Sequence, residues 1–249
     1  MAKVRAKGDE VKGEELLKAV ERFVDSPRKI RQQVDAILEG ARDSLPVDAT
    51  EEQVRRVVER EIVSHYSNRT ALAGGAAALP GLIPGLGTIT ALVGGGILDM
   101  TACLKFEVEM VLALAAVRGY SIEDRRERQL AYLLAAAHTY EATGGKNPLP
   151  DLVKTEIDAI WHYTPRQLGK LVAALFVKLA LVLAGKGLTR AIPFIGVVVS
   201  SAANKTLTQR VGRSVIKALD GRAVARQAKA PAARKVKKAR KPARRARKA

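Results

Sequence analysis

The sequence has little of several residue types. It contains one cysteine, Cys103, and aromatic residues make up 4% of its 249 residues. A single cysteine excludes an internal disulfide framework and a cysteine-based zinc site, as is typical of a reducing compartment. Residues 1–13 lack an apolar stretch and a small-residue cleavage site, so we expect a flexible N-terminus, no secretory signal and a cytoplasmic location. The length suits one large domain or two small ones.

Acidic residues are missing from the C-terminal end. Residues 222–249, here called the basic tail, contain thirteen Lys or Arg and no Asp or Glu. Residues 1–221 hold all 25 acidic residues and carry only +5 of the net charge of +18. Gly221 predicts a helix end before the tail. Two prolines, dense like charge and few large apolar residues predict that the tail is disordered when free.

The basic tail predicts a polyanionic partner, either nucleic acid or an anionic membrane surface. Its lack of aromatic residues disfavours stacking on single-stranded bases. The tail resembles those of linker-histone-like proteins, which implies duplex DNA contacted through phosphates without sequence readout. The alternative is a solvated tail that aids solubility, or a nuclear-localisation-like signal if the source is eukaryotic. The candidate polyanion-binding residues are Arg234, Lys235, Lys237, Lys238, Arg240, Lys241, Arg244, Arg245, Arg247 and Lys248.

The rest of the chain lacks the alternation of Val, Ile and Thr that predicts strands, and its apolar residues recur at helical spacing. Helix starts are predicted at Ser26-Pro27, at the capping boxes Thr50–Gln53 and Thr164–Gln167, and at Ser121–Asp124. The sequence therefore predicts an all-α fold, with one helical domain over residues 14–221.

Residues 70–98 contain no charged residue. That length would suit a membrane span, but Pro80, Pro84 and eight glycines divide the segment. The pieces, 71–79 and 86–98, are shorter than the roughly 20 residues that a straight span needs. We expect two short helices packed through glycines, either in a soluble core or as a membrane-embedded hairpin.

A similar Gly/Pro-broken turn separates the apolar residues 171–184 from 191–203. The chain thus contains the same arrangement twice, a turn of Gly and Pro between two hydrophobic helices. We expect a helical bundle in which two Gly/Pro-broken apolar hairpins pack on one another.

Three stretches together resemble the EcsC family over roughly residues 50–220. They are PGLIPGLG at 80–87 leading through Leu98-Asp99 to the helix 107–116, the turn and acidic helix start at 118–124, and IPFIG at 192–196 with Asn204. This chain has Gly-Tyr where the family has Tyr-Gly, and the basic tail is not part of the pattern. The resemblance implies an all-helical, bacterial-type protein acting near membrane transport systems, with no established catalytic residues.

Asp99 and Glu107 fall on the apolar side of one predicted helix, where an unpaired carboxylate is costly. Candidate partners are Lys186, Arg190 and Lys205 of the second hairpin. The pair is either a polar, proton-responsive site between the hairpins or a structural buried ion pair, unless Glu107 lies at the solvent boundary.

Motifs for metal, cofactor or catalytic chemistry are missing. His65, His138 and His162 stand apart from one another and from Cys103, so no metal site is predicted. Gly185–Thr189 lacks the order of a phosphate-binding loop, and Ser200 and Ser201 lack the context of a nucleophile. We therefore expect no cofactor and no enzymatic activity, although an unrecognised site inside the bundle is kept as a hypothesis.

These observations predict a non-enzymatic helical protein that associates with a membrane, a lipid, a protein partner or a second copy of itself. Its basic tail would bind DNA or an anionic membrane. The alternative is a nucleoid-associated DNA-binding protein in which the helical domain only oligomerises.

Overall fold

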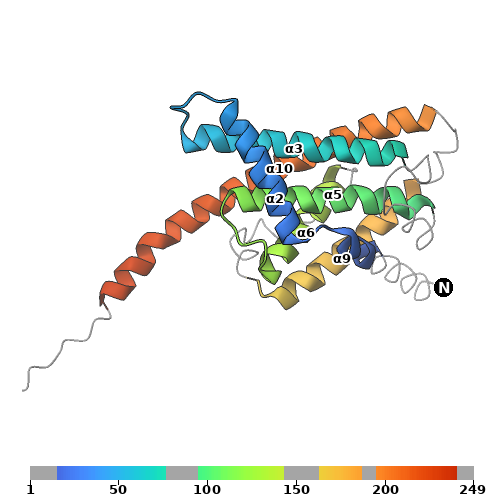
Figure 1. The fold of residues 1–249 in the computed structure, drawn as a ribbon. Coiled ribbons are helices and arrows are strands. Elements are labelled where there is room, and N and C mark those ends of the chain that lie inside the picture. Colours follow the sequence, from blue (N-terminus) through green and yellow to red (C-terminus); the bar gives the residue numbers. More distant parts are fainter. Residues whose placement is uncertain (1–15, 77–94, 143–162, 187–194, 240–249) are drawn as a thin grey trace, which may run out of the picture.

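A computed structural model describes residues 16–76, 95–142, 163–186 and 195–239 of the chain. In these ranges all regular structure is helical, which confirms the all-α prediction (Figure 1). Residues 16–23 are helical, and the longer helices are α2 (Pro27–Asp43), α3 (Glu51–Ala76), α5 (Gly95–Val117), α6 (Arg125–Ala142), α9 (Pro165–Lys186) and α10 (Ile195–Ala239).

Three of the predicted helix starts are confirmed by their capping hydrogen bonds. The Ser26 side chain accepts from the Lys29 backbone N–H at 3.4 Å before α2. Before α3, Gln53 Oε1 accepts from the Thr50 N–H at 2.7 Å, and Thr50 Oγ1 accepts from the Gln53 N–H at 3.2 Å. The Thr164–Gln167 box repeats this exchange at 2.9 and 3.4 Å before α9. Each box satisfies backbone donors that the first helical turn leaves unpaired.

The start of α6 differs from the prediction by three residues. The cap is Asp124, whose Oδ1 accepts from the Arg126 N–H at 2.8 Å, and not Ser121. The Ser121 carbonyl instead accepts from the Asp124 N–H at 3.0 Å and closes a turn. The chain must first complete its reversal after α5 before a new helix can begin.

That reversal begins with a glycine cap on α5. Gly119 has a φ of 75°, the left-handed conformation that glycine adopts without cost. The Tyr120 N–H donates to the Ala115 carbonyl at 3.0 Å, and the Gly119 N–H donates to the Ala116 carbonyl at 2.9 Å. These two bonds form a Schellman motif, which satisfies carbonyls at the helix end.

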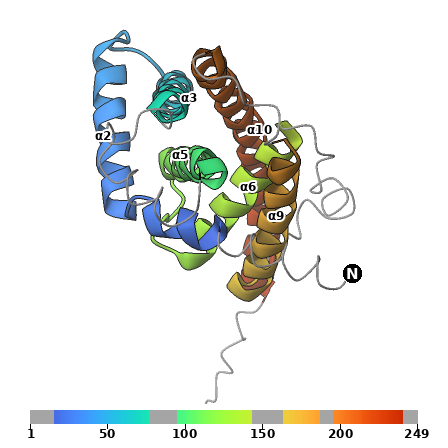
Figure 2. The same cartoon turned by 90° about the vertical axis from the view of Figure 1, so that its right-hand side faces the viewer.

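Helix α5 lies at the centre of the bundle, in contact with α2, α3, α6 and α10 (Figure 2). Residues 102–115 are buried except for the half-buried Lys105 and Phe106. A helix that is apolar on most of its surface has little to present to solvent, so it takes the central place and the other helices surround it. Helix α10 packs chiefly against α3, and α9 packs chiefly against α6.

The two helices predicted at 71–79 and 86–98 are the ends of α3 and α5 where the structure describes them, and α3 and α5 pack against each other. Residues 71–76 continue α3, and residues 95–98 begin α5, so each of the two belongs to a longer helix than predicted. Residues 77–94, with the PGLIPG turn, and residues 187–194 lie outside the described residues. Within the described ranges, no helix combines the length and the apolar character needed to cross a membrane.

The helix end predicted at Gly221 is also wrong. Helix α10 runs through Gly221 and Pro231 to Ala239, and its last turns stand away from the bundle (Figure 1). A glycine that ends a helix usually has a positive φ. Among the described glycines this φ occurs at Gly119, and Gly221 keeps the helical backbone. No described side chain after Leu219 joins the core, as expected for a segment with few large apolar residues. Disorder was predicted for the whole basic tail when free, residues 222–249; residues 222–239 form the end of α10 here, and residues 240–249 lie outside the described residues.

Gly212 allows α10 to approach α3 and α5 closely. A Cβ on this residue would lie 2.7 Å from Val63 Cγ2 and 3.2 Å from Met110 Sδ. We predict that Gly212→Ala lowers the free energy of unfolding by about 1–3 kcal/mol, because Val63 is β-branched and cannot turn away easily. At Gly221 a Cβ meets nothing within 4 Å. Gly221→Ala should therefore raise the free energy of unfolding by about 0.5–1 kcal/mol.

Urea denaturation followed by circular dichroism measures both changes in the same helix. A stabilising effect of Gly212→Ala would contradict the close packing of α10 on α3.

Candidate functional site

The structure describes part of the candidate polyanion-binding set. The backbone of α10 includes Arg234, Lys235, Lys237 and Lys238. The remaining six, Arg240, Lys241, Arg244, Arg245, Arg247 and Lys248, lie outside the described residues. The part of the candidate site whose side chains the structure describes begins where the basic tail leaves the folded body.

Arg222, the first residue of the basic tail, is held by the body. Its two terminal nitrogens donate to the carboxylate oxygens of Glu127 on α6 at 2.7 and 2.6 Å. Its guanidinium carbon lies 3.9 Å from the centre of the Tyr120 ring. The Arg222 and Glu127 side chains are only 11% and 10% exposed. A bidentate ion pair combined with a cation–π contact fixes the direction in which the tail departs.

A second arginine joins three elements next to this point. Arg118 Nε donates to Glu59 Oε1 on α3 at 2.6 Å, and its Nη1 donates to Asp220 Oδ1 on α10 at 2.7 Å. The Arg118 and Glu59 side chains are 8% and 6% exposed. Burial lowers the pKa of Arg118, but the hydrogen bonds and charges of Glu59 and Asp220 outweigh it, so the net shift is upward. Helix α10 is thus tied to α3 and to the end of α5 just before the tail begins.

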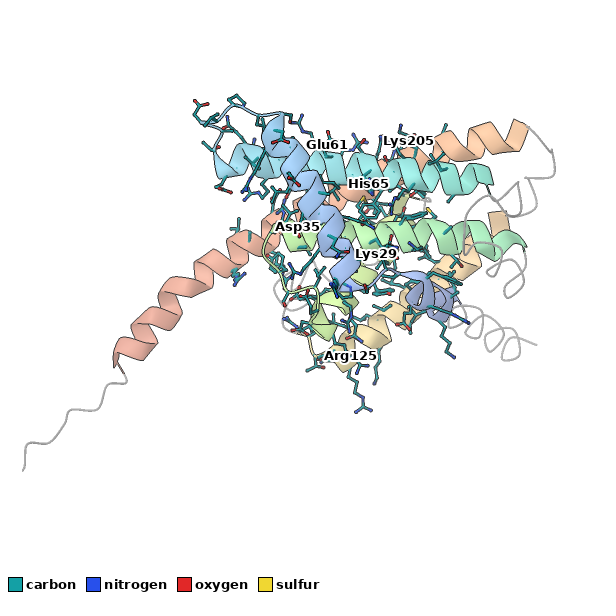
Figure 3. The ribbon with its side chains drawn as sticks, in the orientation of Figure 1. Lys29, Asp35, Glu61, His65, Arg125 and Lys205 are labelled. Carbon is teal, nitrogen blue, oxygen red and sulfur yellow. The ribbon has the colours of Figure 1, made fainter. Side chains whose placement is uncertain are left out.

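The solvent side of α10 carries three exposed cations, Arg210, Arg213 and Lys217, here called the outer face of α10. Arg213 Nε donates to the Gln209 carbonyl at 3.3 Å. Within the part of the chain that the structure describes, none of the three forms an ion pair. Lys205, one turn and a half earlier, is also exposed and points away from the core (Figure 3). Sequence reasoning missed this face because it treated the charge of residues 1–221 as nearly balanced.

Glu107 lies in the core between α5, α6 and α10, and it is 0% exposed. Its Oε1 accepts from Thr208 Oγ1 at 3.4 Å and from Cys103 Sγ at 3.6 Å, and its Oε2 accepts from Thr139 Oγ1. Burial raises the pKa of Glu107 to about 7, against the lowering effect of these three hydrogen bonds. The carboxyl is therefore poised between its neutral and charged forms near neutral pH.

Of the predicted partners of Glu107, the one whose side chain the structure describes, Lys205, does not join it. Lys205 is exposed, and the side chains of Asp99, Lys186 and Arg190 lie outside the described part. The alternative that Glu107 sits at the solvent boundary is wrong, since the side chain is fully buried. In the described core, Glu107 is hydrogen-bonded to neutral hydroxyl and thiol groups, so the predicted buried ion pair is not what the described residues form.

A second buried carboxylate, Glu109, was missed by sequence reasoning. Its Oε1 accepts from Lys105 Nζ at 2.6 Å and from the Asp25 backbone N–H at 2.7 Å. Burial raises its pKa, and the Lys105 charge lowers it in part. The i, i+4 spacing of Lys105 and Glu109 was the available signal, because such a pair on an apolar helix satisfies its own charges. Glu109 thereby joins α5 to the segment that precedes α2.

The histidines give no metal site within the described ranges. There, no group of three or more His, Cys, Asp or Glu residues is placed to hold a metal ion. Burial lowers the pKa of His65, with the Arg69 charge adding to the effect, and it also lowers the pKa of His138. His162 lies outside the described residues.

Comparisons of the chain with models of known families, with curated proteins and with solved structures find no match. The resemblance to the EcsC family therefore stays a prediction that rests on its own short motifs. One of these motifs has a clear structural role, since Gly119 and Tyr120 form the cap that ends α5. The stretch at 80–87 lies outside the described residues.

Proposed function

We propose that this protein is a non-enzymatic helical body whose basic tail binds a polyanion. The observation that carries the proposal is that α10 leaves the core and continues directly into the tail, at a point fixed by Arg222 (Figure 1). Thirteen cations without one acidic residue then follow the body. A polyanion that neutralises such a segment releases its own condensed counterions, which drives binding without any specific pocket.

Two kinds of polyanion suit the tail, a nucleic acid and an anionic membrane surface. The body would bring a second attachment, to a membrane, a lipid, a protein partner or another copy, as its EcsC-like motifs imply. In this proposal the protein is cytoplasmic and lies at the membrane or at the nucleoid.

Deleting residues 227–249 tests the proposal, because the deletion removes eleven of the thirteen tail cations and keeps Arg222 with its partners. The full chain should bind a DNA duplex or phosphatidylserine vesicles at low salt. The deletion should weaken that binding by about 10³-fold or more, since it removes most of the phosphate contacts. Gel shift and vesicle flotation measure the two partners side by side.

Circular dichroism should show that the shortened chain keeps its helical fold. Equal affinity of the two chains, or no binding of the full chain to either polyanion, would overturn the proposal.

A further inference from the structure

The three cations of the outer face of α10 share one side of the helix. Their spacing of i, i+3 and i+7 places Arg210, Arg213 and Lys217 one above the other. The opposite side of the same turns is apolar and buried, and it consists of Val211, Val215 and Leu219. The outer face is therefore a solvent-facing row of charge on a helix whose position is fixed by the core.

Some arginines elsewhere on the surface of the body are paired with an acidic side chain. Arg31 is paired with Glu123, and Arg56 with Glu52. Like charges three and four residues apart repel one another along a helix, and no acidic side chain of the described residues pairs with this row to offset that repulsion. Asp220, the exposed acidic residue farther along α10, is paired with Arg118. An external anion that lies over the row would reduce this repulsion.

The row and the basic tail lie on one continuous helix. At 1.5 Å per residue, the cations from Arg210 to Lys238 are spread along about 40 Å of α10. One strand of a duplex carries a phosphate every 3.4 Å or so. A duplex lying along α10 would therefore pass many phosphates over both sets of cations at once.

The chemistry of α10 favours a duplex over a membrane or a single strand. A helix that lies in a membrane surface needs large apolar residues beside its cations. Among the described side chains of α10, Val224 is the exposed large apolar residue, at 66%. No aromatic residue follows Phe194 in the sequence, so stacking on unpaired bases is not provided for.

We propose that the outer face of α10 extends the polyanion site from the basic tail onto the folded body, and that its ligand is duplex nucleic acid. This inference rests on the proposed function and names the partner of that site. The ion pair between Arg222 and Glu127 fixes α10 at the boundary between the outer face and the basic tail, so that both lie along one helix. The duplex is contacted through its phosphates, without sequence readout.

The test uses the full chain carrying Arg210→Gln, Arg213→Gln and Lys217→Gln, with a fluorescent duplex of mixed sequence as the probe. Binding is followed by anisotropy between about 0.05 and 0.3 M salt. Loss of three phosphate contacts should make the slope of log K against log salt shallower by about 2.7, and should weaken binding by about 10²-fold at 0.1 M salt.

The matched control removes the same charge from the other side of the bundle. Arg22, Arg28 and Arg42 are exposed, and the last two lie on α2, across the bundle from α10 (Figure 2). Their replacement with Gln should leave the slope within about 0.5 of the unaltered chain, since charge removed there faces no phosphate.

The failure of this inference differs from the failure of the proposed function. If deletion of residues 227–249 abolishes duplex binding while the triple replacement on α10 leaves the slope unchanged, the tail acts alone and the outer face is not part of the site. If the full chain binds phosphatidylserine vesicles and not the duplex, the assignment of the partner is overturned.

Discussion

Replacing Glu107 with Gln should make the protein more stable near pH 8, by about 3 kcal/mol, and should change its stability little near pH 5. The cause is the burial of the carboxyl among neutral donors in the core. Burial raises its pKa from 4.5 to about 7, so the folded protein resists ionising a group that the unfolded chain ionises freely. Gln has nearly the shape of the neutral acid, keeps one accepting oxygen and a donor in place of the hydroxyl, and carries no charge at any pH.

The direction of the effect follows from the protons bound by each state. Between about pH 4.5 and 7 the unfolded chain loses the Glu107 proton while the folded protein keeps it, so stability falls as the pH rises through this window. Above the folded pKa both states are ionised and the loss is complete. The shift of the His138 pKa acts in the opposite direction, but it is common to both proteins and cancels in their difference.

Urea denaturation at several pH values, from about 5 to 8, measures this difference. Glu61→Gln is a suitable control, because Glu61 is exposed on α3 (Figure 3) and should leave the pH profile unchanged. Parallel profiles for Glu107→Gln and the unaltered chain would show that Glu107 is ionised in the fold at little cost, and would contradict the account of the core.

Replacing Arg118 with Met should destabilise the protein by about 3–5 kcal/mol, because it leaves the Glu59 carboxylate buried without a cation. The Glu59 side chain is only 6% exposed, whereas the other partner of Arg118, Asp220, is 59% exposed and can return to water. The loss should therefore come mainly from Glu59. Thermal and urea unfolding measure it.

A double replacement separates the ion pair from packing. Glu59→Gln together with Arg118→Met should recover much of the stability, because no charge is then left buried. The exposed pair of Arg31 and Glu123 provides the control, and Arg31→Ala should cost much less than Arg118→Met. Equal losses for Arg31→Ala and Arg118→Met would mean that the Arg118 junction does not hold α10 to α3.

Features set by neighbouring residues were predictable from the sequence. The boxes at Thr50 and Thr164 were predicted because their hydrogen bonds join residues three apart, whatever the rest of the fold does. The course of α10 past Gly221 was not predictable in this way, since it coincides with pairing of Arg222 to Glu127, 95 residues away.

The same distinction explains the outcome for the candidate site. A buried Glu107 followed from its position on an apolar stripe, but its partners, Thr139 and Thr208, come from two other helices. The Arg118 junction was also out of reach, because it joins residues 59 and 102 positions apart. The outer face of α10 could be recognised only from the structure, which shows which cations are exposed and which are paired.

The central claim is that a folded helical body presents a row of cations that binds a polyanion through its phosphates. The most direct measurement is the salt dependence of duplex binding by the full chain. With about eight tail cations engaged, the slope of log K against log salt should be about −7, and contacts from the outer face of α10 should make it steeper, near −10. A slope near −7 would contradict the contribution of the row on the body, and a slope shallower than about −2, or no binding at low salt, would contradict the whole claim.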